Sequence, residues 1–139
     1  MSIFEKYDNF NNMPNDFKSL IIQLLENNYP DEYQFIIKNM DKTNQIKIIT
    51  STHSVERFHN IVKEWDTCYC RGEKHIRSMK TNIQKGIKIP PIVHIFFKGN
   101  EAPVDGRHRL IALSELGFKD VESIPLVNIS EQIKLLQVS

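Results

Sequence analysis

The sequence predicts a mixed α/β fold, in which a compact sheet with flanking helices follows a helical N-terminal extension. Extended apolar runs alternate with amphipathic runs of helical period along most of the 139 residues. The clearest unit is a strand at 92–97, a glycine-containing turn at 105–106 and a helix that ends before Gly117. A hydrophobic content of 40% is enough for one modest core.

Residues 1–44 are predicted to form the helical extension. The first twelve residues, 1–12, are polar and rich in asparagine, so we expect them to be loose. A helix is predicted from about Pro14, because apolar side chains recur at helical spacing as far as Leu25. Pro30 ends that run and starts a second, short helix.

Residues 45–139 are predicted to form the core that contains the sheet. Ile46, Ile48 and Ile49 indicate its first strand. The other predicted elements are helices from Ser54 and from Glu73 to Gln84, strands at 92–97 and 102–104, a helix after Gly106, and a closing segment at 121–129.

The turn Asp105-Gly106-Arg107-His108-Arg109 is the strongest functional feature of the sequence. A helix N-terminus offers free backbone N–H groups and a partial positive charge. Arg107, His108 and Arg109 add donors and charge, which favours binding of a phosphate or another oxyanion. Gly106 would let a ligand approach the backbone without a Cβ in the way. In the simpler interpretation, Asp105 caps the helix and the basic residues form a solvated face.

The turn and its flanks together resemble a known superfamily. The matching segments are Pro90-Pro91-Ile92-Val93, Val104 to Arg109, Ala112, Leu116-Gly117 and Ile124-Pro125-Leu126-Val127. This pattern resembles the ParB/sulfiredoxin superfamily, whose members carry a Gly-x-His-Arg or Gly-x-Arg-Arg turn that opens a helix, with an alanine three residues on. The resemblance extends over residues 45–129 and implies a ParB/sulfiredoxin-like mixed sheet.

The resemblance implies that residues Gly106–Arg109 hold the phosphates of a nucleoside triphosphate such as ATP or CTP, with Mg²⁺ as a further candidate. Arg109 matches the shared arginine, and we expect it to contact a phosphate bidentately. Arg107 stands where sulfiredoxins place their catalytic cysteine, so sulfinic acid reduction is not expected. His108 either hydrogen-bonds a phosphate or packs against the sheet.

Phosphoryl transfer and NTP hydrolysis are the reactions that the resemblance implies, because free serine kinases of the superfamily carry an Asp-Gly-His-x-Arg turn. Asp105 beside a phosphate could hold Mg²⁺ or orient an acceptor hydroxyl. Asp105 and His108 are therefore the candidate catalytic residues of a kinase, NTPase or nuclease. Such an enzyme also needs a general base, and the sequence leaves four candidates open: Glu56, Asp66, Glu73 and Glu101.

The charge is unevenly distributed, although the net charge is only +1. Residues 71–88 hold six basic side chains against one acidic side chain. Such a stretch could contact nucleic acid, so the alternative function is a non-enzymatic module that binds DNA or a protein partner. A solvated helix face explains the same charges. The candidate contacts are Arg71, Lys74, Arg77 and Lys80.

Cys68 and Cys70 are too close in sequence for an ordinary structural disulfide, and we expect free thiols in a reducing cytoplasm. The N-terminal residues lack a signal-peptide pattern, and no apolar run approaches the ~18 residues of a membrane span. The spacing of potential zinc ligands fits no familiar pattern, so no metal site is predicted. The ligands considered are Cys68, Cys70, His53, His59 and His75.

Overall fold

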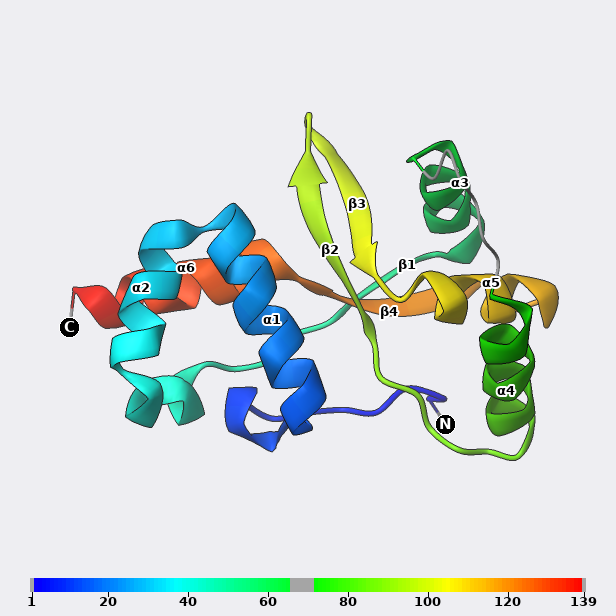
Figure 1. Cartoon of the computed structure of the whole chain (residues 1–139), viewed down its shortest axis with the longest axis horizontal. Coiled ribbons are helices and arrows are strands. Elements are labelled where there is room, and N and C mark those ends of the chain that lie inside the picture. Colours follow the sequence, from blue (N-terminus) through cyan, green and yellow to red (C-terminus); the bar gives the residue numbers. More distant parts are fainter. Residues whose placement is uncertain (1, 66–71, 139) are drawn as a thin grey trace. The chain divides into compact units, whose positions relative to one another are not determined.

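The chain has the predicted mixed α/β fold, built around one four-stranded sheet (Figure 1). The computed structural model describes residues 2–65 and 72–138. The contacts divide the chain into a first unit, Met1–Lys6 with Thr50–Ile124, and a second unit, Tyr7–Ile49 with Pro125–Ser139. The helices of the predicted extension thus share a unit with the C-terminal helix, a grouping that the sequence interpretation did not include.

The sheet of the first unit has the strand order β1-β4-β2-β3. Strands β1 and β4 pair antiparallel, with Ser51 opposite Ser123. Strands β2 and β3 form an antiparallel hairpin whose register shifts between Val93 and His94. The strand predicted at 102–104 is longer in the structure, where it extends from Asn100 to Asp105. The strands are β1 (Ser51–Ser54), β2 (Ile92–Phe97), β3 (Asn100–Asp105) and β4 (Asp120–Pro125).

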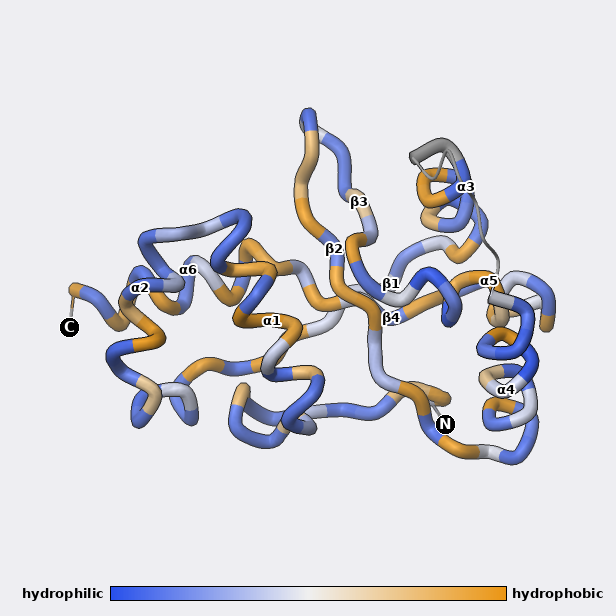
Figure 2. The backbone as a smooth tube through the Cα atoms, in the orientation of Figure 1, coloured by the Kyte–Doolittle hydropathy of each residue, from blue (hydrophilic) through white to orange (hydrophobic). Residues whose placement is uncertain are grey.

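Three predicted helices of the first unit are confirmed: α3 (Val55–Trp65), α4 (Glu73–Gln84) and α5 (Arg107–Glu115). Hydrophilic and hydrophobic positions alternate along α4, as expected for an amphipathic helix (Figure 2). Helix α5 packs on both α3 and α4, and its residues 110–113 are buried. The core joins these helices to the sheet through side chains that include Phe58, Ile76, Ile92, Leu110, Leu113 and Val121.

The prediction that residues 1–12 are loose is wrong. Within the first unit, Phe4 is buried and forms a β-bridge with Ile89. Within the second unit, Phe10 is 1% exposed at the start of a short 3-10 helix, Phe10–Asn12. The two phenylalanines anchor a segment whose polar neighbours remain at the surface.

The second unit contains the predicted helices α1 (Asn15–Asn28) and α2 (Pro30–Lys38), followed by a 3-10 helix, Met40–Gln45. The strand predicted at Ile46–Ile49 is wrong. Ile46 accepts a backbone hydrogen bond from Phe10, and the next residue pairs with Asn9, so this segment pairs with the N-terminal residues of its own unit and does not join the sheet.

The segment 121–129, predicted to close the core, holds the end of β4 and the start of a helix that was not predicted, α6 (Leu126–Gln137). The buried residues of α6 follow a helical spacing that the sequence already contained: Leu126, Ile129, Ser130 and Ile133. Among the described residues, no helix combines the length and the apolar character needed to cross a membrane.

Candidate anion-binding site

Helix α5 begins directly after β3, at the turn singled out in the sequence. Gly106 is its N-cap residue, with φ +97° and ψ 25°, and no side chain caps the helix from that position. A left-handed conformation of this kind favours glycine. Asp105, the predicted cap, instead accepts a hydrogen bond of 2.7 Å from Nη2 of Arg109. The start of α5 therefore keeps the positive end of the helix dipole without a capping carboxylate from Asp105.

Gly106 is also required by its surroundings. A Cβ at this position would lie 2.3 Å from Cγ2 and 2.9 Å from Cβ of Ile92, and 3.1 Å from Nη2 of Arg109. The close approach that needs glycine is therefore that of β2 against the turn.

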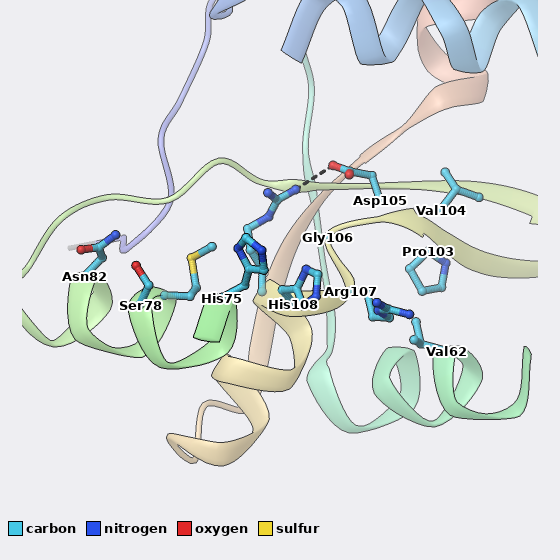
Figure 3. Close-up of a pocket in the computed structure, with 12 residues that line it drawn as sticks. Val62, His75, Ser78, Asn82, Pro103, Val104, Asp105, Gly106, Arg107 and His108 are labelled. Atoms are coloured by element: carbon cyan, nitrogen blue, oxygen red, sulfur yellow. Dashed lines mark hydrogen bonds and ion pairs between the residues drawn. The ribbon is translucent and has the colours of Figure 1, made fainter. Parts of the chain in front are cut away.

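A cavity of about 590 Å³ lies against this turn (Figure 3). All five turn residues, 105–109, line it, and one face of α4 forms another wall. The α4 face offers hydroxyl, amide, imidazole and thioether groups through Ser78, Asn82, His75 and Met79. The rings of His75 and His108 lie 5.4 Å apart between their centroids.

A second helix begins beside the same cavity. Gly72, with φ +66°, is the N-cap residue of α4, and this helix also lacks a side-chain cap. A Cβ on Gly72 would lie 2.6 Å from Nε2 of His108, so the start of α4 is next to the His108 ring. Two helix N-termini therefore meet around one imidazole, an arrangement that favours an anion. The sequence interpretation missed it, although Gly72 before an amphipathic run was a usable signal.

His108 lies near the cationic side chains Arg107 and Arg109, and its surroundings favour the neutral imidazole. Its pKa is lowered from 6.5, chiefly because the ring is removed from water and further by the positive charge of Arg107, with smaller effects from His75 and Arg109. At neutral pH the imidazole can accept or donate one hydrogen bond without adding charge.

Arg109 is largely buried, with 14% of its side chain exposed. Its Nη2 donates to Asp105 and, at 3.4 Å, to the carbonyl of Pro91. Its charge is thus balanced by Asp105 within the protein, whereas the resemblance implies a bidentate contact with a phosphate. Nε of Arg109, by contrast, is buried without a hydrogen-bond partner among the described groups, and such a donor is costly to leave unpaired.

The remaining candidate bases do not converge on the turn. Glu56 lines another cavity, and Glu101 contacts two histidines on the sheet. Glu73 begins α4 but is not among the residues that line the turn cavity. Within the described part of the chain, Asp105 is the only carboxylate that lines it. Asp66, Cys68, Cys70 and Arg71 lie outside the described residues.

The predicted basic stretch is only partly available for nucleic acid. Lys74 and Arg77 are exposed on α4. Lys80 forms an ion pair with Glu115 of α5, so its positive charge is already neutralised and attracts a phosphate backbone less strongly. Among the predicted contacts that the structure describes, Lys74 and Arg77 therefore remain for a partner, whereas Lys80 is already paired.

A cluster that the sequence interpretation did not assemble lies on the sheet. Nε2 of His94 (β2) and Nδ1 of His53 (β1) lie 3.4 and 3.7 Å from Oε2 of Glu101 (β3). Burial lowers the pKa of His94 to about 4 and, less strongly, that of His53. Nη2 of Arg57 lies 3.2 Å from Oε1 of Glu101.

No family model and no curated protein matches the chain. Among solved structures, it is similar to sulfiredoxin from Arabidopsis thaliana, with 16% sequence identity and a TM-score of 0.42. The similar region covers 55% of this chain and 83% of that chain. This likeness concerns part of the fold alone.

Proposed function

We propose that the first unit binds a nucleotide, with the phosphates at the start of α5. The observation that carries the proposal is the uncapped N-terminus behind Gly106, which opens onto a cavity lined by Arg107 and His108. Backbone N–H groups, the helix dipole and a guanidinium together favour a polyanion.

The size and lining of the cavity support a nucleotide over an isolated phosphate. A volume of about 590 Å³ falls within the range of ~300–1,000 Å³ that is usual for small-molecule sites. The end at the turn is cationic, whereas Val62 and Met79 add apolar surface suited to a base. Ser78 and Asn82 add hydrogen-bonding groups that suit a sugar or a base edge.

The turn residues have different roles at the proposed site. Arg107 and the first N–H groups of α5 contact the phosphates. Arg109 holds the turn through Asp105, and its unpaired Nε–H, which is buried, would reach a ligand only if the side chain moved. A bidentate contact by Arg109, as the resemblance implies, would require Nη2 to leave Asp105.

The proposed function of this site is nucleotide binding and does not include catalysis. Catalysis by Asp105, whether through Mg²⁺ or through an acceptor hydroxyl, would require its carboxylate to exchange Arg109 for the new partner. Phosphoryl transfer and NTP hydrolysis therefore have less support than binding. His108 is neutral and lines the cavity, so a hydrogen bond to a phosphate oxygen is its proposed role.

The test measures melting temperature and calorimetric affinity with ATP, CTP, GTP and ADP, each with and without Mg²⁺. A nucleotide at one hundred times its Kd should add about 2.7 kcal/mol of stability. We expect Arg107→Gln to weaken binding by roughly tenfold or more, because a charge-assisted contact is worth ~1.5–3 kcal/mol. Arg77→Gln, on the exposed face of α4, is the matched control and should bind as the wild type does. Equal affinities of the two variants would contradict the site.

The second candidate function is nucleic-acid binding, favoured by the exposure of Lys74 and Arg77 three residues apart on α4. The same two variants separate it from nucleotide binding. DNA binding through α4 predicts that Arg77→Gln lowers both the affinity and its salt dependence, whereas Arg107→Gln does not. Affinity for duplex DNA that neither variant changes would remove this candidate.

A further inference from the structure

The cluster of His53, His94 and Glu101 is distinct from the turn cavity, since none of its residues lines that cavity. The three residues come from β1, β2 and β3, and each offers one ligand atom within 4.8 Å of the other two. His94 is 1% exposed, whereas Glu101 is 31% exposed at its side chain. The cluster is therefore buried at the histidines and open at the carboxylate.

A serine hydroxyl fixes each imidazole from behind. Nδ1 of His94 lies 2.6 Å from Oγ of Ser123, and Nε2 of His53 lies 2.6 Å from Oγ of Ser51. These serines face each other across the β1–β4 pair. When each of these ring N–H groups donates to its serine, the other ring nitrogen presents a lone pair toward Glu101. This is the arrangement that orients histidine ligands in metal sites.

Ring stacking holds the same orientation. The His53 ring stacks on Phe58 at 4.7 Å and meets the His94 ring edge-on at 4.7 Å. Phe58 itself is fully buried, so the cluster packs against the hydrophobic core. The cluster is thus pre-organised by packing as well as by hydrogen bonds.

The ion pair between Arg57 and Glu101 leaves the second ring nitrogen of His94 unsatisfied. Nε2 of His94 is buried without a hydrogen-bond partner, although it lies 3.4 Å from the Glu101 carboxylate. With the ring proton on Nδ1 of His94, the Nε2 lone pair faces the carboxylate, which is repulsive, and a buried unpaired polar atom is costly. A cation between the ring nitrogens and the carboxylate would remove both costs.

Two of the three ligand-atom separations suit a small metal ion, and the third, between the two ring nitrogens, is within 4.8 Å. Ligand atoms around a tetrahedral zinc at ~2.0–2.1 Å lie about 3.3–3.4 Å from one another. The separations of 3.4 Å from His94 and 3.7 Å from His53 to Oε2 of Glu101 lie within a few tenths of an ångström of that value.

We propose that Nδ1 of His53, Nε2 of His94 and the Glu101 carboxylate form a site for a divalent transition-metal ion of the zinc class. Two imidazoles and one carboxylate suit zinc and its first-row neighbours, whereas Mg²⁺ and Ca²⁺ prefer oxygen ligands. Three protein ligands leave a fourth position open for water or another small ligand.

Arg57 is the group that a metal would displace. Its Nη2 lies 3.2 Å from both Oε1 of Glu101 and Nδ1 of His53. The side chain is 44% exposed and lines, with Glu101, a cavity of about 460 Å³. Arg57 can therefore move into solvent and leave an entry path to the carboxylate.

The test titrates the chelator-treated full chain with Zn²⁺ by calorimetry and with Co²⁺ by visible absorption. We expect one ion per chain, a Co²⁺ d–d band without a thiolate charge-transfer band, and no competition from excess Mg²⁺ or Ca²⁺. Glu101→Gln and His53→Gln should each weaken binding at least tenfold. Glu122→Gln, on the neighbouring strand β4, is the matched control and should not.

Two further variants keep the test decisive if a ligand variant folds poorly. Arg57→Ala should bind Zn²⁺ more tightly, because a competing cation is gone. The double variant Cys68→Ser, Cys70→Ser should bind as the wild type does. Loss of binding in the cysteine variant, or wild-type affinity in both Glu101→Gln and His53→Gln, would overturn the proposal. Unchanged affinity in Arg57→Ala would equally contradict a site shared with this guanidinium.

Discussion

The first unit has two polar regions that favour ligands of opposite charge: the turn at 105–109 favours an anion, and the cluster of His53, His94 and Glu101 favours a cation. The turn presents helix N-termini and guanidiniums to an open cavity. The cluster presents imidazole lone pairs and a carboxylate, mostly away from water. Each already contains a counter-charge: Asp105 pairs with Arg109, and Arg57 pairs with Glu101.

Each region is therefore stabilised without a ligand by its own counter-charge. An internal partner holds the charged group in place and also competes with the ligand that the region would bind. Removing that partner should therefore make the fold less stable and the ligand bind more tightly. At the turn, Asp105 is that partner, and the backbone geometry of Gly106 holds it in place.

The largest effect is expected from Gly106→Ala. The new Cβ would meet Ile92 at 2.3 Å in a backbone conformation with φ +97°. Left-handed strain and overpacking each cost ~1–3 kcal/mol, so we expect a loss of about 3–5 kcal/mol in the free energy of unfolding. Denaturant unfolding of the variant, compared with the wild type, measures this loss.

Gly117→Ala is the control for that prediction. Gly117 has φ +84°, but a Cβ there would meet nothing within 4 Å. Its cost should be the conformational part alone, about 1–2 kcal/mol. Equal losses in the two alanine variants would show that contact with β2 is not what requires Gly106.

The features that the sequence predicted are local ones. Gly106 and the helix after it could be predicted because strand, turn and helix occupy consecutive residues and each has its own composition. The cavity wall formed by α4 could not be predicted, since the packing of α4 on α5 depends on tertiary contacts. The ion pair between Asp105 and Arg109 spans four residues, yet a cap was an equally good local interpretation.

The features that were missed depend on distant partners. His53, His94 and Glu101 lie on three strands, and only the sheet order brings them together. Ile46 lies in an extended segment, as its composition suggested, but it pairs with Phe10 of the N-terminal segment. Helix α6 is not predicted although its apolar spacing is visible, because the closing segment at 121–129 has no assigned secondary structure in the sequence interpretation.

An intermediate effect is expected from Asp105→Asn. The substitution removes the partner of a guanidinium that is only 14% exposed, which should cost about 1–3 kcal/mol of stability. It also releases Nη2 of Arg109 toward the cavity, so nucleotide affinity should rise several-fold. Calorimetric titration and denaturant unfolding of the same preparation measure the two changes together.

The Mg²⁺ dependence of binding in Asp105→Asn decides between the two roles of Asp105. If Asp105 were a Mg²⁺ ligand, Asp105→Asn would lose the Mg²⁺-dependent part of nucleotide binding, and the rise in affinity would be absent. Glu115→Gln removes a carboxylate from the ion pair with Lys80 at the other end of α5. As a control it should change stability by less than about 1 kcal/mol and leave affinity unchanged.

The smallest effect is expected from the titration of His108. Its pKa lies below 6.5, mainly because of burial and then because of Arg107, so the folded chain binds fewer protons than the unfolded chain in the window just below pH 6.5. The contribution of His108 to stability is therefore complete above about pH 6.5 and is lost as the pH falls toward the lowered pKa.

A bound anion favours the imidazolium and reverses this trend. Sulfate, which does not titrate in this pH range, should therefore bind more tightly and stabilise the fold more as the pH falls. The melting temperatures of the wild type and of His108→Gln, measured from about pH 7 to about pH 5 with and without sulfate, isolate His108 from the other histidines. Parallel pH profiles for the two proteins in sulfate would mean that the anion does not lie beside His108, and the phosphate position proposed at the start of α5 would have to move.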